Sequence, residues 1–172
     1  KLIEYNSRFG DPEGVIALEL LENSFLDICT NIIKGIKNNN INFSKSAIMG
    51  LYLVPITYPN SNFDKYDIYI EDNITDNIYY ANVELSEDKK HIYTLKSRSI
   101  LVTSKGKTLI EANTKVNNII TKIHSKFKYR NDIINNYLSK YEQSGVSINN
   151  GENAIKLIKP YVEKTNKNNV SS

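Results

Sequence analysis

Apolar residues in the first quarter of the chain recur with the period of an amphipathic helix. Between residues 11 and 36 they are separated by three or four positions, the spacing that lines one face of a helix. Ser24 is followed three residues later by Asp27, a pattern similar to the capping box that begins a helix. The chain is therefore predicted to form two consecutive helices with a break near residues 23–24. The apolar positions are Val15, Leu18, Leu21, Phe25, Ile28, Ile32 and Ile36.

The pattern changes at residue 46 to short apolar and β-branched segments, which polar, turn-forming clusters separate. Such segments are typical of strands in a sheet. The first of them stops at Pro55, since proline cannot donate to a sheet ladder. The expected strands cover residues 46–54, 67–70, 77–85, 91–95 and 100–103.

A third helix is predicted after the last of these strands. Residues 105–107 indicate a turn, and Thr108 with Glu111 repeats the capping-box spacing at the start of a helix over residues 108–124. The fold class expected for residues 44–136 is therefore α+β, with a mainly antiparallel sheet packed on this helix. The residues expected in its core are Leu53, Leu101, Leu109, Val116 and Ile120.

The end of the chain carries weaker signals. A further helix is expected to start within residues 129–133. Residues 144–172 contain one short helical pattern at 152–159, followed by a tail rich in Lys, Asn and Ser that we expect to be loose.

Composition narrows the class of protein. The chain has 172 residues, of which 40% are hydrophobic and 24% charged, as in globular proteins. Its apolar runs are too short to cross a bilayer, and a net charge of +3 is too small and scattered to indicate nucleic-acid binding. The single cysteine, Cys29, fits a reducing, cytoplasmic location, and we interpret it as a small core residue rather than a nucleophile.

The first residues carry the candidate chemistry. Glu4 and Asn6 alternate with Ile3 and Tyr5, so a strand here would place the carboxylate and the amide on one face. Hard oxygen ligands of this kind suit Mg²⁺, which otherwise keeps water and phosphate oxygens as ligands. Arg8 follows on the same face and offers a guanidinium to phosphate or carboxylate.

The next residues indicate a turn and a helix start. Gly10 permits a tight turn or a close approach of the backbone to a ligand. Asp11 is predicted as the N-cap and Pro12 as the first helical residue. A purely structural alternative remains open for the whole segment, in which Glu4 and Asn6 are solvated positions of an edge strand and Arg8 pairs with Asp11.

The run from Glu4 to Glu13, Glu-Tyr-Asn-Ser-Arg-Phe-Gly-Asp-Pro-Glu, resembles the signature of the phosphoribosylamine–glycine ligases, an ATP-grasp family of purine biosynthesis. The resemblance implies ATP-dependent joining of glycine to 5-phosphoribosylamine, through an acyl phosphate, to give glycinamide ribonucleotide. It implies that Glu4 and Asn6 ligate Mg²⁺ or Mn²⁺ and that Arg8 and Asp11 are catalytic. Arg8, Asp11 and Glu13 would also bind substrate, with Asp11 meeting the substrate amine if its carboxylate is not used for capping.

The resemblance continues to about residues 132–137. It includes a Ser-Arg pair before a strand at Arg98, the Thr-Leu-x-Glu-Ala start of a helix at Thr108, and Tyr-Arg-x-Asp-Ile at Arg130. Arg98 is a candidate for binding substrate phosphate, although it and Arg130 could equally brace the domain against carboxylates such as Asp132. For Arg130 we favour the bracing role.

The resemblance covers only the C-terminal part of such an enzyme. The glycine-rich loop and the lysines that cover the nucleotide in an ATP-grasp fold have no counterpart here. We expect residues 1–43 to be the C-terminal end of an ATP-grasp domain, residues 44–143 the ligase C-terminal domain, and residues 144–172 a short helix and tail. The chain would then be a fragment, inactive alone, that works with an N-terminal ATP-grasp portion in cis or as a separate chain. Two alternatives stay open: a non-catalytic remnant or companion subunit acting as a binding or assembly module, and a domain of another ATP-grasp enzyme.

Overall fold

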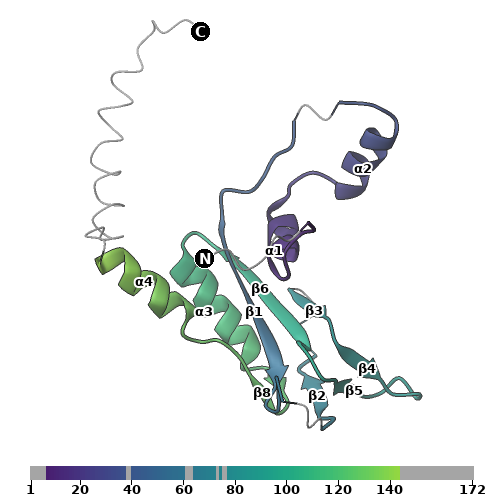
Figure 1. Ribbon diagram of the computed structural model, residues 1–172, viewed down its shortest axis with the longest axis vertical. Helices are drawn as coiled ribbons and strands as arrows, with labels where there is room; N and C mark the ends of the chain where they lie inside the picture. The colour runs from purple at the N-terminus through teal and green to yellow at the C-terminus, as the bar shows by residue number, and fades with distance from the viewer. Residues whose placement is uncertain (1–6, 38–39, 61–63, 73, 75–76, 144–172) are drawn as a thin grey trace, which may run out of the picture. The chain divides into compact units, whose positions relative to one another are not determined.

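A computed structural model describes residues 7–37, 40–60, 64–72, 74 and 77–143 (Figure 1). The chain divides into two compact units after Arg130, and each is described by itself below. Residues 152–159 and the rest of the tail lie outside the described residues. No described helix is both long and apolar enough to cross a membrane.

Two helices occupy the beginning of the chain, as predicted. α1 spans Glu13–Leu20 and α2 spans Phe25–Ile33. Ser24 is the N-cap of α2, and its side chain accepts a hydrogen bond from the backbone N–H of Asp27 at 3.2 Å. The prediction for α1 is wrong by one residue, because Pro12 occupies the N-cap position and no side chain caps this helix. The carboxylate of Asp11 is engaged elsewhere.

Two four-stranded sheets follow, and every strand pair in them is antiparallel. This confirms the α+β class. The first sheet has the order β3-β6-β1-β8 and consists of β3 (Ile78–Tyr80), β6 (Ile100–Gly106), β1 (Ala47–Pro55) and β8 (Phe127–Lys128). The second has the order β4-β5-β2-β7 and consists of β4 (Val83–Leu85), β5 (Ile92–Thr94), β2 (Asp67–Ile70) and β7 (Ile123–His124).

The strand predicted over residues 77–85 is two strands in different sheets. β3 pairs with β6, whereas β4 pairs with β5. Between them Ala81 and Asn82 donate backbone hydrogen bonds to Ser99 and Arg98, the two residues before β6. These bonds hold the chain where it passes from one sheet to the other, so a continuous apolar pattern does not give a continuous strand.

The turn predicted at residues 105–107 is also wrong, because β6 continues to Gly106, which pairs with Ala47. A Cβ added to Gly106 would lie 2.6 Å from the backbone nitrogen of Ala112, so this glycine permits a close approach of the following helix. That helix, α3, spans Leu109–Ile120 and is shorter than predicted, since Ile123–His124 forms β7. Its N-cap, Thr108, accepts a hydrogen bond from the Glu111 backbone N–H at 3.2 Å, as expected.

Strand β1 is covered on both faces. Leu51 and Leu53 are buried on the face that α3 covers, with Val116 and Ile120 of that helix also buried. Leu109 is only half-buried. The core prediction is thus confirmed for Leu53, Val116 and Ile120, and Leu101 is buried as well. The other residues that share this core are Met49, Ile100, Val102 and Ala112.

The opposite face of β1 receives α1. Gly50 and Tyr52 point to this face, because successive residues of a strand alternate between its two sides. A Cβ on Gly50 would lie 2.7 Å from Cδ1 of Ile16, so the missing side chain lets α1 approach the strand closely. Directly across the ladder, Thr103 pairs with Gly50 and therefore shares its face.

Glu19 of α1 binds this face through polar contacts. Its carboxylate accepts a hydrogen bond from Thr103 Oγ1 at 2.9 Å and another from the Tyr79 hydroxyl, and Lys105 Nζ lies 3.4 Å away. Burial disfavours ionisation, but the hydrogen bonds from Tyr79 and Thr103 and the charge of Lys105 outweigh it, so the pKa of Glu19 lies below its usual value. Partial burial of the Tyr79 hydroxyl, together with its hydrogen bond to Glu19, raises the pKa of Tyr79 to about 12. α1 is therefore held to the sheet by apolar contact at Ile16 and by a charged network at Glu19.

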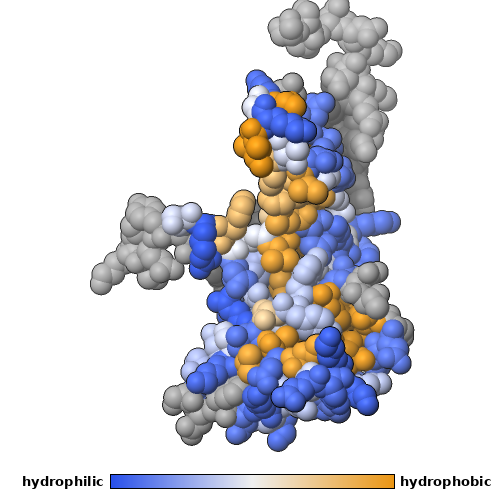
Figure 2. All heavy atoms as spheres, turned by 90° about the vertical axis from the view of Figure 1, so that its right-hand side faces the viewer, coloured by the Kyte–Doolittle hydropathy of each residue, from blue (hydrophilic) through white to orange (hydrophobic). Residues whose placement is uncertain are grey.

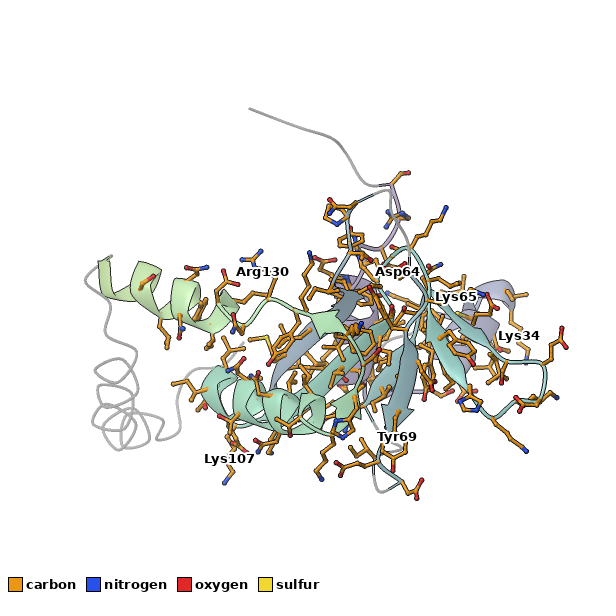
Figure 3. All side chains as sticks on the ribbon, turned by 90° about the horizontal axis from the view of Figure 1, so that it is seen from below. Lys34, Asp64, Lys65, Tyr69, Lys107 and Arg130 are labelled. Atoms are coloured by element: carbon orange, nitrogen blue, oxygen red, sulfur yellow. The ribbon has the colours of Figure 1, made fainter. Side chains whose placement is uncertain are left out.

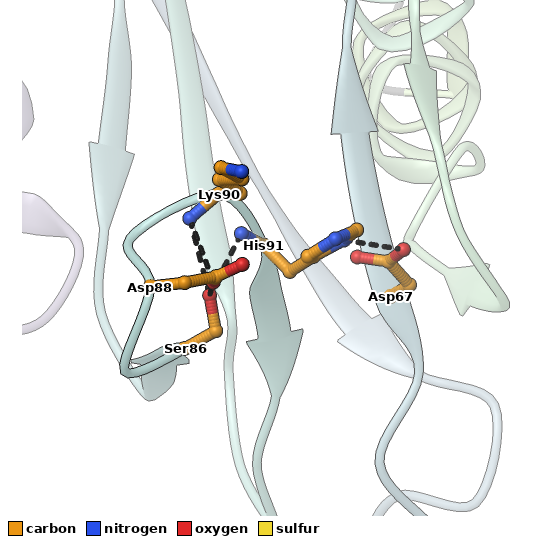
Figure 4. A network of polar contacts seen from close by, with 5 residues as sticks. All are labelled: Asp67, Ser86, Asp88, Lys90 and His91. Atoms are coloured by element: carbon orange, nitrogen blue, oxygen red, sulfur yellow. Dashed lines mark hydrogen bonds and ion pairs between the residues drawn. The ribbon is translucent and has the colours of Figure 1, made fainter.

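A polar network closes the hairpin between β4 and β5 in the second sheet (Figure 4). Ser86 Oγ donates to Asp88 Oδ1 at 2.5 Å and accepts a bond from the His91 backbone N–H at 2.9 Å. The bonds from Ser86 and from the Lys90 backbone lower the pKa of Asp88. His91 Nδ1 lies 3.3 Å from Asp67 Oδ2 on β2. The bonds around Ser86 thus form one of the polar turns expected between the predicted strands, here between residues 85 and 91.

The second unit contains α4, which spans Ile133–Gln143. The prediction of a helix starting by residue 133 is confirmed. Asn136 Nδ2 donates to Asp132 Oδ2 at 2.8 Å, one turn earlier.

Candidate functional site

The predicted metal ligands, Glu4 and Asn6, lie outside the described residues, so their role stays a prediction. Within the described part of the chain, no three His, Cys, Asp or Glu side chains gather where they could hold a metal ion. The assignment of Mg²⁺ or Mn²⁺ therefore depends on the opening segment alone.

Arg8 and Glu13 contact their own segment. Arg8 Nη1 donates to the backbone carbonyl of Phe9 at 2.8 Å, and the residue is exposed. The Glu13 side chain folds over Gly10, where an added Cβ would lie 2.5 Å from Glu13 Oε2. The glycine thus allows a close approach, as predicted, but in this structure the approaching group is a carboxylate of the same motif.

Asp11 meets residues from two distant parts of the chain. The Tyr52 hydroxyl on β1 donates to Asp11 Oδ1 at 2.6 Å. Arg98, just before β6, donates from Nη1 to the Asp11 backbone carbonyl at 2.7 Å and lies 3.2 Å from Oδ2. The Arg98 guanidinium also lies 5.3 Å from the centre of the Tyr52 ring, within cation–π range. We call Asp11, Tyr52 and Arg98 the Asp11 cluster.

The Asp11 cluster answers one alternative left open by the sequence, since Asp11 pairs with Arg98 and not with Arg8. It also fixes the protonation state of Tyr52. Burial, together with the hydrogen bond to Asp11, raises the pKa of Tyr52 to about 12, so the hydroxyl keeps its proton and acts as a donor at neutral pH. Each oxygen of the Asp11 carboxylate therefore has one partner. A carboxylate has about four acceptor positions, so both oxygens can still accept a further bond.

A cavity of about 630 Å³ opens beside the Asp11 cluster. Three cationic residues and one carboxylate line it, together with three tyrosines and three apolar residues. The excess of positive charge favours an anionic ligand, and the rings and prolines offer it an apolar wall. The lining residues are Asp11, Pro12, Tyr52, Val54, Tyr58, Pro59, Arg98, Lys128, Tyr129 and Arg130.

The cavity joins predicted and unpredicted residues. Asp11 and Arg98 are brought together, and Arg130, which follows β8 (Figure 3), lies at the same cavity. Lys128 and Tyr52 were missed by sequence reasoning. Residues two apart in a strand share a face, so the predicted strand over residues 46–54 places Tyr52 on the same face as Gly50. This alternation is the sequence signal that could have identified Tyr52. Lys128 lies in a two-residue strand that carries no signal in the sequence.

Comparisons with known proteins agree on one family. The family model described as "Phosphoribosylglycinamide synthetase, C domain" matches residues 48–136. The phosphoribosylamine–glycine ligase of Methanosarcina barkeri is 37% identical over 134 residues, which are 77% of this chain and 30% of that protein. The ligase of Methanoregula boonei is 36% identical over the same length, covering 77% of this chain and 31% of its own. The chain thus spans about a third of the length of these relatives.

A solved structure shows the same fold. It is the crystal structure of a phosphoribosylamine–glycine ligase from Thermotoga maritima, with a TM-score of 0.64 and 24% sequence identity. The match covers 76% of this chain and 32% of that one.

Proposed function

Because this chain belongs to the phosphoribosylglycinamide synthetase family and carries its C domain, we propose that it is the C-terminal part of a phosphoribosylamine–glycine ligase. The complete enzyme would join glycine to 5-phosphoribosylamine at the expense of ATP and form glycinamide ribonucleotide in de novo purine biosynthesis. The observation that carries the proposal is the match over residues 48–136, preceded in the same chain by the Glu4–Glu13 signature.

The apolar side of α2 supports the need for a further portion. α2 is amphipathic, yet none of its residues is buried. Leu26 is 75% exposed and Ile33 86% exposed, and hydrophobic side chains gather on this part of the surface (Figure 2). Such a face is normally covered by another element or partner. We propose that the N-terminal ATP-grasp portion, in cis or as a separate chain, packs on it.

The roles proposed within the signature follow from the chemistry of each group. Asp11, oriented by Tyr52 and Arg98, would accept a hydrogen bond from the substrate amine and hold its lone pair toward the activated glycine. Arg8 would bind a phosphoryl or carboxylate oxygen, and Glu13 would contribute to substrate binding. When bound at Glu4 and Asn6, Mg²⁺ or Mn²⁺ would supply positive charge to the phosphate oxygens.

These roles also explain why the isolated chain should be inactive. It offers Asp11 and its cavity for the amine substrate but no glycine-rich loop for ATP. The experiment is to combine the chain with the part of the Methanosarcina barkeri ligase that precedes the matched region, either fused or coexpressed. Formation of glycinamide ribonucleotide and ADP, dependent on both parts and all three substrates, is expected. A stable complex that forms no product would favour the alternative of a non-catalytic companion subunit.

A further inference from the structure

Helix α1 is fixed to the first sheet at both of its ends. Just before its start, Asp11 binds one side chain from β1 and one that precedes β6. In its last turn, the Glu19 carboxylate accepts hydrogen bonds from Tyr79 on β3 and from Thr103 on β6. The helix has eight residues and is about 12 Å long, so a rotation of its last turn also moves its start.

The groups that hold the two ends belong to one face of the sheet. Thr103 of β6 pairs with Gly50 of β1. Tyr52, two residues further along β1, pairs with Leu101. Because residues two apart in a strand share a face, Tyr52 and Thr103 both face α1. Between these two contacts, the Ile16 side chain lies against Gly50, where an added Cβ would come within 2.7 Å of its Cδ1 atom.

Glu19 attaches α1 to the sheet with a defined orientation. Its side chain is only 13% exposed, and burial of a carboxylate is unfavourable unless fixed partners replace the lost water. Tyr79, Thr103 and Lys105 supply these partners, with Lys105 Nζ at 3.4 Å from Glu19 Oε2. Hydrogen bonds require particular directions, whereas the apolar contact of Ile16 allows the helix to rotate or slide. The Glu19 contacts therefore specify how α1 is rotated on the sheet.

The first turn of α1 transmits this orientation to Asp11. The Gly14 backbone N–H donates to the Gly10 carbonyl at 2.8 Å. The Ile16 N–H donates to the Pro12 carbonyl at 3.1 Å. The residues on both sides of Asp11 are thus bonded to the helix, so the Asp11 backbone must follow when α1 rotates.

From these contacts we propose that Glu19 is a positioning residue for Asp11, acting through the orientation of α1. The inference rests on the proposed function, in which Asp11 accepts a hydrogen bond from the substrate amine. Tyr79 and Thr103, which lie in the matched C domain, then contribute to turnover without touching a substrate. A small displacement of a group at the reacting atoms is enough to slow a reaction strongly.

The first test is a double-mutant cycle in the assembly of this chain with the N-terminal portion. Glu19→Ala should lower kcat about tenfold and leave the KM values for ATP and glycine unchanged. Glu19→Gln keeps an oxygen that can accept both hydroxyl bonds, so it should recover most of this loss. In an Asp11→Asn background, Glu19→Ala should lower kcat less than about twofold, because the residue that it positions is already impaired. Equal losses in the two backgrounds would contradict an action through Asp11.

Val116→Ala is the matched control for a loss of stability. Val116 is fully buried in α3, on the opposite face of the sheet from α1, so its truncation destabilises the domain without changing a contact of α1. At a temperature where every variant is folded, it should leave kcat unchanged. Equal losses of kcat in Val116→Ala and Glu19→Ala would show that Glu19 contributes stability alone, and would overturn the proposal.

The chain by itself provides a readout that does not depend on ligase activity. The NMR signal of the Tyr52 ring carbon that carries the hydroxyl, assigned with Tyr52→Phe, reports the hydrogen bond to Asp11. Glu19→Ala should shift this signal toward its position in Asp11→Ala, whereas Val116→Ala should not. An unshifted signal in a folded Glu19→Ala chain would overturn the coupling, even if the assembly is an active ligase. A shifted signal, with an assembly that forms no product, would keep the coupling and overturn the proposed function.

Discussion

Arg98 and Asp11 are 87 residues apart in sequence, yet Arg98 Nη1 lies 2.7 Å from the backbone carbonyl of Asp11 and 3.2 Å from its carboxylate. A single guanidinium thus holds both the main chain and the side chain of Asp11, which lies just before α1. Through this pair, a residue just before β6 in the C domain positions a residue of the Glu4–Glu13 signature.

Arg98→Lys should lower activity more than stability. A lysine keeps the charge but cannot reach the carbonyl and the carboxylate with the fixed geometry of a guanidinium. The pair is substantially exposed, so the free energy of unfolding should fall by about 1 kcal/mol or less. In the assembled enzyme, kcat/KM should fall about tenfold or more as Asp11 loses its orientation. Lys65→Ala is the control, because it removes another exposed ion pair, the one with Glu84. An equal loss of activity in Lys65→Ala would contradict the proposal that Arg98 positions Asp11.

Tyr52→Phe removes the hydrogen bond to Asp11 and keeps the ring beneath Arg98. The free energy of unfolding should fall by about 0.5–1.5 kcal/mol, the usual net value of one hydrogen bond. Spectroscopic titration should also lose a tyrosine with a pKa of about 12. Tyr69→Phe, which changes an exposed tyrosine on β2, should leave stability unchanged. If the titration of Tyr52→Phe instead lacks a tyrosine of ordinary pKa, Tyr52 is not a partly buried hydroxyl that donates to Asp11.

Glu19 should make stability depend on pH in the acid range. Its folded pKa lies below the ordinary value of 4.5, so the unfolded chain takes up its proton first as the pH falls. The contribution of Glu19 is therefore fully present above pH 4.5 and is lost as the pH falls through the folded pKa. Glu19→Gln should lower the free energy of unfolding at pH 7, and the gap to the wild type should narrow below pH 4.5, as measured by urea unfolding. A gap that stays constant with pH would show that the charge of Glu19 contributes nothing.

The apolar side of α2 predicts a defect in assembly. Leu26→Asp should weaken binding to the N-terminal ATP-grasp portion by about tenfold or more, because an unpaired carboxylate would be buried on assembly. Leu85→Asp introduces the same charge at an exposed leucine of β4 and should not affect it. Sedimentation of the mixed parts measures the effect, and sedimentation of this chain alone tests self-association. Loss of self-association in Leu26→Asp, without loss of binding to the other portion, would assign α2 to a homodimer instead.

Local chemistry accounts for what the sequence could predict. The break at Ser24 and the start of α3 at Thr108 each depend on a cap and a backbone N–H three residues later, so they are visible in a short window. The division of residues 77–85 into β3 and β4 depends on partners that lie later in the chain, and no local pattern reveals it. The same holds for the pairing of Asp11 with Arg98.

For the site, the resemblance to the family predicted more residues than local sequence patterns did. It identified Asp11 and Arg98 as candidates, but not that they contact each other. It gave no indication of Lys128, whose place at the cavity follows from the pairing of β8 with the end of β1. Tertiary pairing brings these residues together, and only the structure contains it.

The most direct test of the ligase assignment and of the role of Asp11 is product formation by this chain joined to the N-terminal portion of a relative. Asp11→Asn is compared with Asp64→Asn in this assembly. Asp64 is an exposed aspartate outside the cavity, so its substitution controls for the loss of one carboxylate. We expect glycinamide ribonucleotide from the unsubstituted assembly and from Asp64→Asn, and a rate about 10²-fold lower for Asp11→Asn. An active assembly in which Asp11→Asn turns over as fast as Asp64→Asn would contradict the placement of Asp11 at the reacting amine, and a stable assembly that forms no product would contradict the ligase assignment itself.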